Sequence, residues 1–343
     1  EKLRRGLFVF FREATNARNL LDLLPALTPE NARRVALCTD DRQPPDLLDE
    51  GGIDAMLRAV VQAGVPPVEA LRLVTLNPAE YFGLRDRGAV APGRRADLLV
   101  AGPELAELRV DAVWAAGELV AEDGRAVGWE ASRVPPPAPS MRPRLDDDVF
   151  RIPFEGDGRV RVIGVVENQI VTTAEEATPT VREGEVAADP ERDLLKIAVL
   201  ERHAGSGRVG LGLVRGMGLE RGAIAGTVAH DHHNLIVVGA DDAAMLRAAR
   251  AVAEMEGGLA VATGGEVLAT LPLPVGGLMS ELPIEEVRVR LDRVVGAARG
   301  LGSSLHDPFM AMSFLGLEVI PSLKITDRGL IDVDAFRPVD LRV

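Results

Sequence analysis

Short apolar runs that alternate with helical patterns constrain the first part of the chain more than any other feature. The runs Leu7 to Phe11 and Arg34 to Cys38 have the length of buried strands, whereas Ile53 to Ala63 and Pro67 to Val74 have the spacing of helices. Strands that alternate with helices indicate a parallel sheet covered on both faces. In such folds the chemistry lies at the carboxyl ends of the strands.

Charged residues stand where these two strands end. Arg12 and Glu13 follow the first run, and Asp40 and Asp41 follow the second. Adjacent carboxylates repel each other unless a cation or a donor-rich ligand lies between them. Asp is also common in turns. The pair therefore indicates either a solvated loop after a strand or a site for a cation or ligand.

Two further helices have recognisable starts. We expect a short helix over Ala17 to Leu24 with Asn16 as its N-cap. A longer amphipathic helix follows Asp241-Asp242, one of which supplies its N-cap, and ends at Gly257.

The pattern changes along the chain in a way that predicts separate domains. Residues 86–130 hold short strands joined by Gly and Pro turns, which indicate a small β unit. Residues 131–145 are rich in proline and indicate a semi-rigid linker. Residues 146–343 mix buried strands with amphipathic helices, which is typical of an α+β domain.

Composition narrows the functional classes. The net charge of −13 argues against non-specific binding to nucleic acid or to an anionic membrane. No apolar run has the length of a membrane span, and the first residues lack the pattern of a signal peptide. The single cysteine, Cys38, argues for a reducing, cytoplasmic setting, and its place inside a strand favours packing over nucleophilic chemistry.

Three of the five histidines fall within the stretch "AHDHHN", which contains His230, Asp231, His232, His233 and Asn234. A carboxylate beside an imidazole fixes its tautomer, as a metal site or a proton relay requires. The structural alternative is a polar turn before the next strand, with the aspartate bonded to backbone amides.

Several motifs of the chain resemble those of one family. The eighth strand of an amidohydrolase-superfamily barrel is similar to "ALCTDD" followed by "PPDLL", and the preceding helix and strand are similar to "LRRGLFVFFRE". The superfamily's return from barrel to β-sandwich resembles "LNPAEYFGL" and "GAVAPGRRADLLV". The extra C-terminal domain of bacterial-type adenine deaminases resembles "GTVAHDHHNLIVVG", "LPLPVGGLMS" and "DPFMAMSFLGLEVIPSLKITDRGLIDV". The chain thus resembles the C-terminal portion of that family.

The resemblance implies a mixed architecture of α/β and α+β parts. Residues 1–85 would be the last strands and helices of a TIM-type metal-dependent hydrolase barrel, and residues 86–130 a β-sandwich element. The family's C-terminal α+β domain would follow the linker, over 146–343. A closed barrel needs eight strands, and we expect two, so the resemblance implies a barrel remnant.

The resemblance also implies an activity: hydrolytic deamination of adenine to hypoxanthine and ammonia, in purine salvage, at a divalent metal that is manganese or iron. Asp40 would bind the metal and handle the proton of the nucleophilic water, and Asp41 would bind the purine. The further substrate-binding candidates are Glu13, His230, Asp231 and His233. The three from the histidine stretch would face Asp40 at the mouth of the barrel, with His232 pointing elsewhere.

The sequence departs from the family at two places. Ala14-Thr15 stands where Gly-Ser is usual, and His232 stands where Ser is usual. Most of the family's metal ligands, which lie on earlier barrel strands, are not in this chain. Two alternatives therefore stay open: a non-catalytic truncated binding or assembly module, and an amidohydrolase that acts on another cyclic amine or amide. A homo-oligomer is compatible with the sequence.

Overall fold

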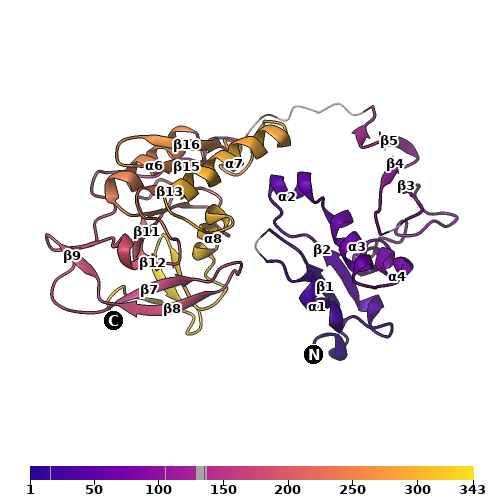
Figure 1. Ribbon diagram of the computed structural model, residues 1–343, viewed down its shortest axis with the longest axis horizontal. Coiled ribbons are helices and arrows are strands. Elements are labelled where there is room, and N and C mark those ends of the chain that lie inside the picture. Colours follow the sequence, from indigo (N-terminus) through magenta and orange to yellow (C-terminus); the bar gives the residue numbers. More distant parts are fainter. Residues whose placement is uncertain (16, 105, 129–134, 136) are drawn as a thin grey trace. The chain divides into compact units, whose positions relative to one another are not determined.

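The computed structural model describes residues 1–15, 17–104, 106–128, 135 and 137–343. The chain divides into two compact units, Glu1–Val134 and Pro135–Val343, coloured indigo to magenta and magenta to yellow in Figure 1. Two expectations lie outside the described residues, namely the Asn16 N-cap and the part of the proline-rich linker at 131–134 and 136. Among the described residues, no helix is both long and apolar enough to cross a membrane.

The N-terminal unit is built on a two-stranded parallel sheet of β1 (Val9–Arg12) and β2 (Val35–Cys38). Val9 lies opposite Val35 and Arg12 lies opposite Cys38. Because the strands are parallel and in step, both end at the same edge of the sheet. The helices of this part are α1 (Leu20–Leu23), α2 (Pro44–Asp49), α3 (Ile53–Gln62), α4 (Pro67–Val74) and α5 (Leu76–Tyr81), with 3₁₀ turns at Leu3–Arg5, Leu24–Ala26 and Ala32–Arg34.

Strand and helix predictions for this unit hold with two corrections. The first strand lies at Val9–Arg12, two residues later than its predicted start at Leu7, because Gly6 ends a 3₁₀ turn in the left-handed conformation just before it. The predicted helix Ala17 to Leu24 is wrong in its first turn, since Glu13 and Arg18 form an isolated antiparallel bridge that keeps the chain extended. Two paired strands are too few to establish a barrel, so the barrel remnant stays a prediction.

A four-stranded antiparallel sheet follows, in the order β3-β4-β5-β6. Its strands are short, and tight turns join β4 to β5 and β5 to β6, as the Gly-rich pattern predicts; Gly117, between β4 and β5, has a φ of +88°. The described residues place these strands in one sheet, and whether it is part of a β-sandwich stays a prediction. Their bounds are β3 (Leu98–Ala101), β4 (Val110–Ala115), β5 (Glu118–Glu122) and β6 (Arg125–Ala126).

The C-terminal unit is organised by an eight-stranded sheet in the order β16-β15-β13-β14-β11-β12-β7-β8. Its neighbouring strands are antiparallel, except that β7 and β12 are parallel. The bounds are β7 (Val160–Val165), β8 (Thr172–Ala177), β11 (Leu195–Leu200), β12 (Val209–Arg215), β13 (Ala223–Gly226), β14 (Leu235–Gly239), β15 (Gly258–Ala262) and β16 (Val267–Pro272). A separate hairpin joins β9 (Thr180–Arg182) and β10 (Glu185–Ala187).

Both faces of this sheet are covered. Ala198 and Leu200 of β11 join a core with helix α6 (Asp242–Glu254), whereas Ile197 and Val199 join a second core on the opposite face. This double burial explains why every position of β11 except Lys196 is apolar, instead of every second one. The second face is covered by α7 (Ile284–Gly300), α8 (Pro308–Ser313), the 3₁₀ turn Phe314–Gly316 and a small sheet of β17 (Leu323–Thr326), β18 (Gly329–Asp332) and β19 (Arg337–Val339) (Figure 1).

Helix caps in this unit follow the sequence. Asp241 accepts the backbone N–H of Ala244 at 2.7 Å, which identifies it as the N-cap of α6. Gly257, with a φ of +117°, follows soon after the helix ends. The later part of the proline-rich segment packs with this unit, because Arg142 donates its backbone N–H to the carbonyl of Arg202 at 2.8 Å.

Two glycine substitutions test the contact between the eight-stranded sheet and the small sheet of β17, β18 and β19. Gly210 lies in β12, and a Cβ there would overlap the carbonyl oxygen of Thr326 and lie 2.8 Å from the nitrogen of Gly329. We expect Gly210→Ala to lower the free energy of unfolding of this unit by about 3 kcal/mol or more, as overpacking does. Gly296→Ala, in open space on α7, is the control and should raise it by about 0.5–1 kcal/mol. Urea unfolding followed by circular dichroism measures both, and equal midpoints would contradict the packing described.

Candidate functional site

The turn after β2 carries the predicted acidic pair. Asp40 has a φ of +59°, in the left-handed region that Asp tolerates better than most residues. Arg12, from the end of β1, donates a hydrogen bond from Nη1 to Asp40 Oδ2 at 3.0 Å, and the Asp40 side chain is 48% exposed. Since an ion pair this exposed contributes little stability, a competing cation or ligand has access to the Asp40 carboxylate.

The neighbouring carboxylate has different surroundings. Asp41 is half-buried, its Oδ2 atom is shielded from solvent, and its backbone oxygen accepts the N–H of Thr15 at 3.3 Å. Two adjacent acids are thus held in an exposed and a shielded environment. Such a difference commonly gives two carboxyl groups different tasks.

Glu13, the third predicted residue of this region, has a structural contact. Its Oε2 accepts the backbone N–H of Leu20, at the start of α1, at 3.1 Å. The Glu13 backbone N–H continues the strand pairing by donating to the carbonyl of Cys38 at 3.1 Å. If the Glu13 carboxylate also binds substrate, it must do so while it accepts the N–H of Leu20 at the start of α1.

Thr15 and Asp46 form a buried link that the sequence patterns did not indicate. The Thr15 hydroxyl donates to Asp46 Oδ2 and accepts the backbone N–H of Gln43 at 2.8 Å. Arg18 donates to the other Asp46 oxygen at 3.0 Å. The link ties the segment after β1 to the start of α2 and so fixes both ends of the acidic turn. The hydroxyl kept at Thr15 was the one available signal.

The described residues do not complete a metal site. They contain no group of three or more His, Cys, Asp or Glu side chains placed to hold an ion. Since divalent metals in proteins commonly take three or more protein ligands, Asp40 would supply one ligand of such a site. This arrangement fits part of a divalent metal centre and does not fit a whole one.

Cys38 is unsuited to nucleophilic chemistry. Burial raises the pKa of its thiol, and the nearby Asp40 carboxylate raises it further, while Arg12 acts in the opposite direction. The thiol therefore stays protonated at neutral pH, as expected of a packing residue.

The histidine stretch forms the connection between β13 and β14. The ring of His230 stacks on Phe314, with centroids 4.5 Å apart and planes 17° from parallel, and its Nδ1 lies 3.1 Å from Ser313 Oγ. His233 closes the turn, since its backbone N–H donates to the carbonyl of Ala229 at 2.6 Å. The two imidazoles, 5.8 Å apart, form the ring pair of this turn.

Asp231 and His232 are exposed, whereas Asn234 is buried. His232 places its Nε2 2.5 Å from Glu318 Oε1. Ser313 and the Ala229 amide contact the Nδ1 atoms of His230 and His233, and whether Asp231 orients either imidazole stays a prediction. Whether this turn faces Asp40 stays a prediction.

Two buried basic side chains, Arg202 and Lys324, support the turn, and the sequence patterns indicated neither of them. Arg202, 1% exposed, donates its Nε to the carbonyl of His233 at 2.5 Å and its Nη2 to that of Gly276 at 2.9 Å. Lys324, fully buried, donates its Nζ to the carbonyls of Phe314 and Ile170 at 2.9 and 2.8 Å. Burial lowers the pKa of Lys324 to about 7. The small number of lysines in the chain was the one sequence feature that set Lys324 apart.

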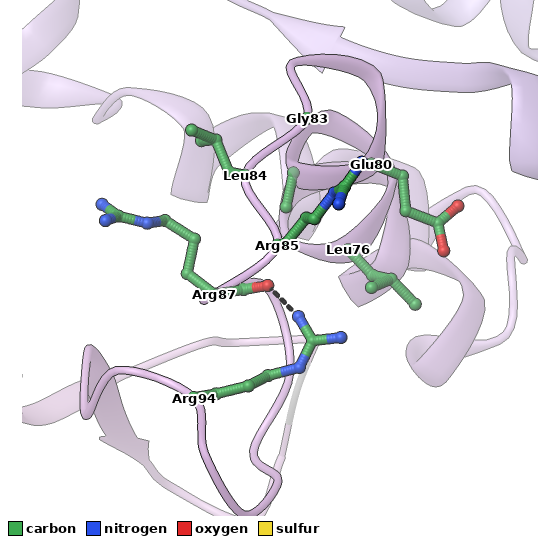
Figure 2. Close-up of a pocket in the computed structure, with 8 residues that line it drawn as sticks. Leu76, Glu80, Gly83, Leu84, Arg85, Arg87 and Arg94 are labelled. Atoms are coloured by element: carbon green, nitrogen blue, oxygen red, sulfur yellow. Dashed lines mark hydrogen bonds between the residues drawn. The ribbon is translucent and has the colours of Figure 1, made fainter.

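A cavity of about 340 Å³ lies elsewhere in the N-terminal unit (Figure 2). Three arginines line it, and Arg94 donates to the carbonyl of Arg87 across its lower part. Its lining contains none of the predicted site residues, so it is separate from the acidic turn. The lining residues are Leu76, Ala79, Glu80, Gly83, Leu84, Arg85, Arg87 and Arg94.

Comparison with known proteins agrees with the sequence motifs. The adenine deaminase C-terminal domain family matches residues 169–337, and the amidohydrolase family matches residues 8–120. The adenine deaminase of Desulfatibacillum aliphaticivorans is 50% identical over 344 residues, which cover 99% of this chain and 60% of that protein. The chain is therefore similar to adenine deaminases, and its residues 169–337 match their C-terminal domain.

Two further adenine deaminases are similar to this chain to nearly the same extent. The adenine deaminases of Methanothrix thermoacetophila and Oleidesulfovibrio alaskensis are 48% and 46% identical, and the matched part covers 99% of this chain and 59% of each relative. The chain thus spans about 60% of the length of these adenine deaminases. A β-aspartyl dipeptidase from Fervidobacterium islandicum AW-1 aligns with 38% of this chain and 37% of its own, at 20% identity and a TM-score of 0.30, too low to support a structural argument.

The buried Lys324 predicts a pH dependence of stability. Its pKa is about 7 in the folded chain against an ordinary 10.5, so between these values the unfolded chain binds more protons than the folded one. Stability should therefore rise as the pH increases from about 7 towards 10. Lys324→Met should remove this contribution.

Urea unfolding at several pH values measures this contribution. The slope of unfolding free energy against pH should be smaller for Lys324→Met than for the wild type. Equal slopes for the wild type and Lys324→Met would show that Lys324 stays charged in the folded state.

Proposed function

We propose that the protein containing this chain hydrolyses adenine to hypoxanthine and ammonia with the help of a divalent cation. The observation that carries the proposal is similarity to adenine deaminases over 99% of the chain, with Asp40 and Asp41 in a turn after a parallel strand. We further propose manganese or iron as the cation, purine salvage as the role and the cytoplasm as the location.

Asp40 and Asp41 would have different roles in the reaction. Asp40, exposed and held by a weak ion pair, would supply a metal ligand and accept the proton that hydrolysis releases. Asp41, with a shielded oxygen, would form a hydrogen bond with the purine. The side chains of Glu13, His230, Asp231 and His233 would contribute to substrate binding.

A non-catalytic role is the second candidate, and one observation favours it. The described residues supply no complete set of metal ligands. The adenine deaminase proposal therefore needs the part of the relatives' length that this chain does not span. The binding-module proposal does not need this additional length. The two proposals therefore differ in whether the longer protein hydrolyses adenine.

Substitution of Asp40 in the longer protein tests the assigned role. Asp40→Asn keeps the side-chain size and a residue type that tolerates a φ of +59°. We expect kcat to fall about 10³-fold or more, since both a metal ligand and a proton acceptor are lost. Asp41→Asn is the matched control and should raise KM for adenine while the bound metal stays constant.

Hypoxanthine formation by the purified proteins measures kcat and KM, and metal analysis of the same proteins measures the bound metal. If Asp40→Asn kept wild-type turnover and metal content, the carboxylate would have neither role.

A further inference from the structure

The arginine-lined cavity of the N-terminal unit has no part in the roles assigned above (Figure 2). Its walls come from the end of α5 with the residues that follow it, and from the loop that precedes β3. At about 340 Å³ its volume is in the range of pockets that bind small molecules. Three arginines and one glutamate line it, so the lining carries a net positive charge.

One of the three arginines is neutralised by its own neighbours. Arg87 donates Nε and Nη2 to the two carboxylate oxygens of Asp86, both at 3.0 Å, and its Nη1 lies 3.7 Å from Asp97. In Figure 2 the guanidinium of Arg87 points away from those of Arg85 and Arg94. Arg87 is therefore not the cation that a ligand in the cavity would meet.

Arg85 and Arg94 keep hydrogen-bond donors for a ligand. Within the part of the chain that the structure describes, the exposed guanidinium of Arg85 has neither a carboxylate nor a carbonyl partner. Arg94 is half-buried and donates Nη1 to the carbonyl of Arg87, which leaves Nε and Nη2 without a partner among the described residues. Glu80, the acid of the lining, lies 3.4 Å from Arg33, and this contact offsets its charge. Two guanidinium groups with unused donors at one cavity are suited to an anion.

Backbone contacts fix the frame of this cavity. The N–H of Leu84 donates to the carbonyl of Ala79 at 2.8 Å, and the N–H of Arg95 donates to the carbonyl of Asp86 at 2.7 Å. Gly88 brings the following loop close to α5, since a Cβ there would lie 2.7 Å from the Cβ of Ala79. A site whose backbone is already ordered loses little freedom when a ligand binds.

We propose that Arg85 and Arg94 bind the phosphate group of a small ligand in this cavity. The guanidinium group is planar and presents paired N–H donors that match the spacing of phosphate oxygens. Leu76 and Leu84, also in the lining, offer apolar surface to the rest of such a ligand. A phosphate ester and inorganic phosphate share the chemistry that the arginines recognise, and only the ester would use the leucines. This proposal does not depend on the proposed function.

Calorimetric titration of the longer protein with adenosine monophosphate and with inorganic phosphate tests the ligand class. We expect both to bind, with affinities that fall as salt is added, because solvent-exposed charges are screened. Tighter binding of the monophosphate would support an ester as the ligand, and equal binding would support free phosphate. The absence of binding by either compound at about 1 mM would overturn the proposal.

Two arginine substitutions locate the bound phosphate. Arg94→Gln should weaken the affinity about tenfold or more, as expected for the loss of a charge-assisted hydrogen bond. Arg95→Gln is the matched control, because Arg95 pairs with Asp97 at 2.9 Å and is not in the lining. It should leave the affinity unchanged.

Gly83 allows a second test that keeps all the arginines. It lines the cavity with a φ of +69°, and a Cβ there would meet no atom within 4 Å. Asn and Asp both tolerate this backbone region. Gly83→Asp adds a competing carboxylate and should weaken binding about tenfold, whereas Gly83→Asn has the same size and should keep most of the affinity. Circular dichroism establishes that each variant is folded.

Three results would overturn the proposal. The first is equal affinity of Arg94→Gln and Arg95→Gln, and the second is equal affinity of Gly83→Asp and Gly83→Asn, since either would place the phosphate elsewhere. The third is binding by the 343-residue chain but not by the longer protein, because the rest of the longer protein would then fill the cavity.

Discussion

The parallel pairing of β1 with β2 is the constraint on which the acidic turn depends. Because Arg12 lies opposite Cys38, the two strands end together and the next residues of both segments meet. The Arg12–Asp40 pair and the Thr15–Asp46 link both follow from this register. A shift of one residue would move each strand's side chains to the opposite face and separate these groups. The turn is therefore fixed by backbone pairing first and by charge second.

The histidine turn is built on a different principle. Arg202 and Lys324 are buried, and the contacts that support the turn are made to backbone carbonyls. A charge without a nearby opposite charge is costly to bury, and the lowered pKa of Lys324 reflects that cost. Donors that hold carbonyls fix the backbone on either side of the turn.

Local signals in the sequence predicted the parts of the fold that depend on neighbouring residues. The helix at Pro67–Val74 and the Asp241 cap rest on contacts within a few positions, and the strand at Val35–Cys38 was indicated by its own apolar run. The acidic pair and the histidine stretch were found as candidates for the same reason. The barrel remnant and the distance between these candidates remain predictions.

The missed groups act over long separations. Lys324 reaches a carbonyl 154 positions away, and Ser313 reaches His230 over 83 positions. No periodicity or short motif signals such contacts, since they arise only after the sheets have packed. The error at Ala17 has the same origin, because the bridge from Glu13 to Arg18 overrides the local helical preference.

Adenine turnover by two proteins tests the central claim most directly. The 343-residue chain and a longer protein of the relatives' full length are each supplied with manganese, and hypoxanthine formation is followed by ultraviolet absorbance. The account predicts hypoxanthine from the longer protein and none from the chain alone, because the described residues supply no complete set of metal ligands. Hypoxanthine from the 343-residue chain by itself would contradict it.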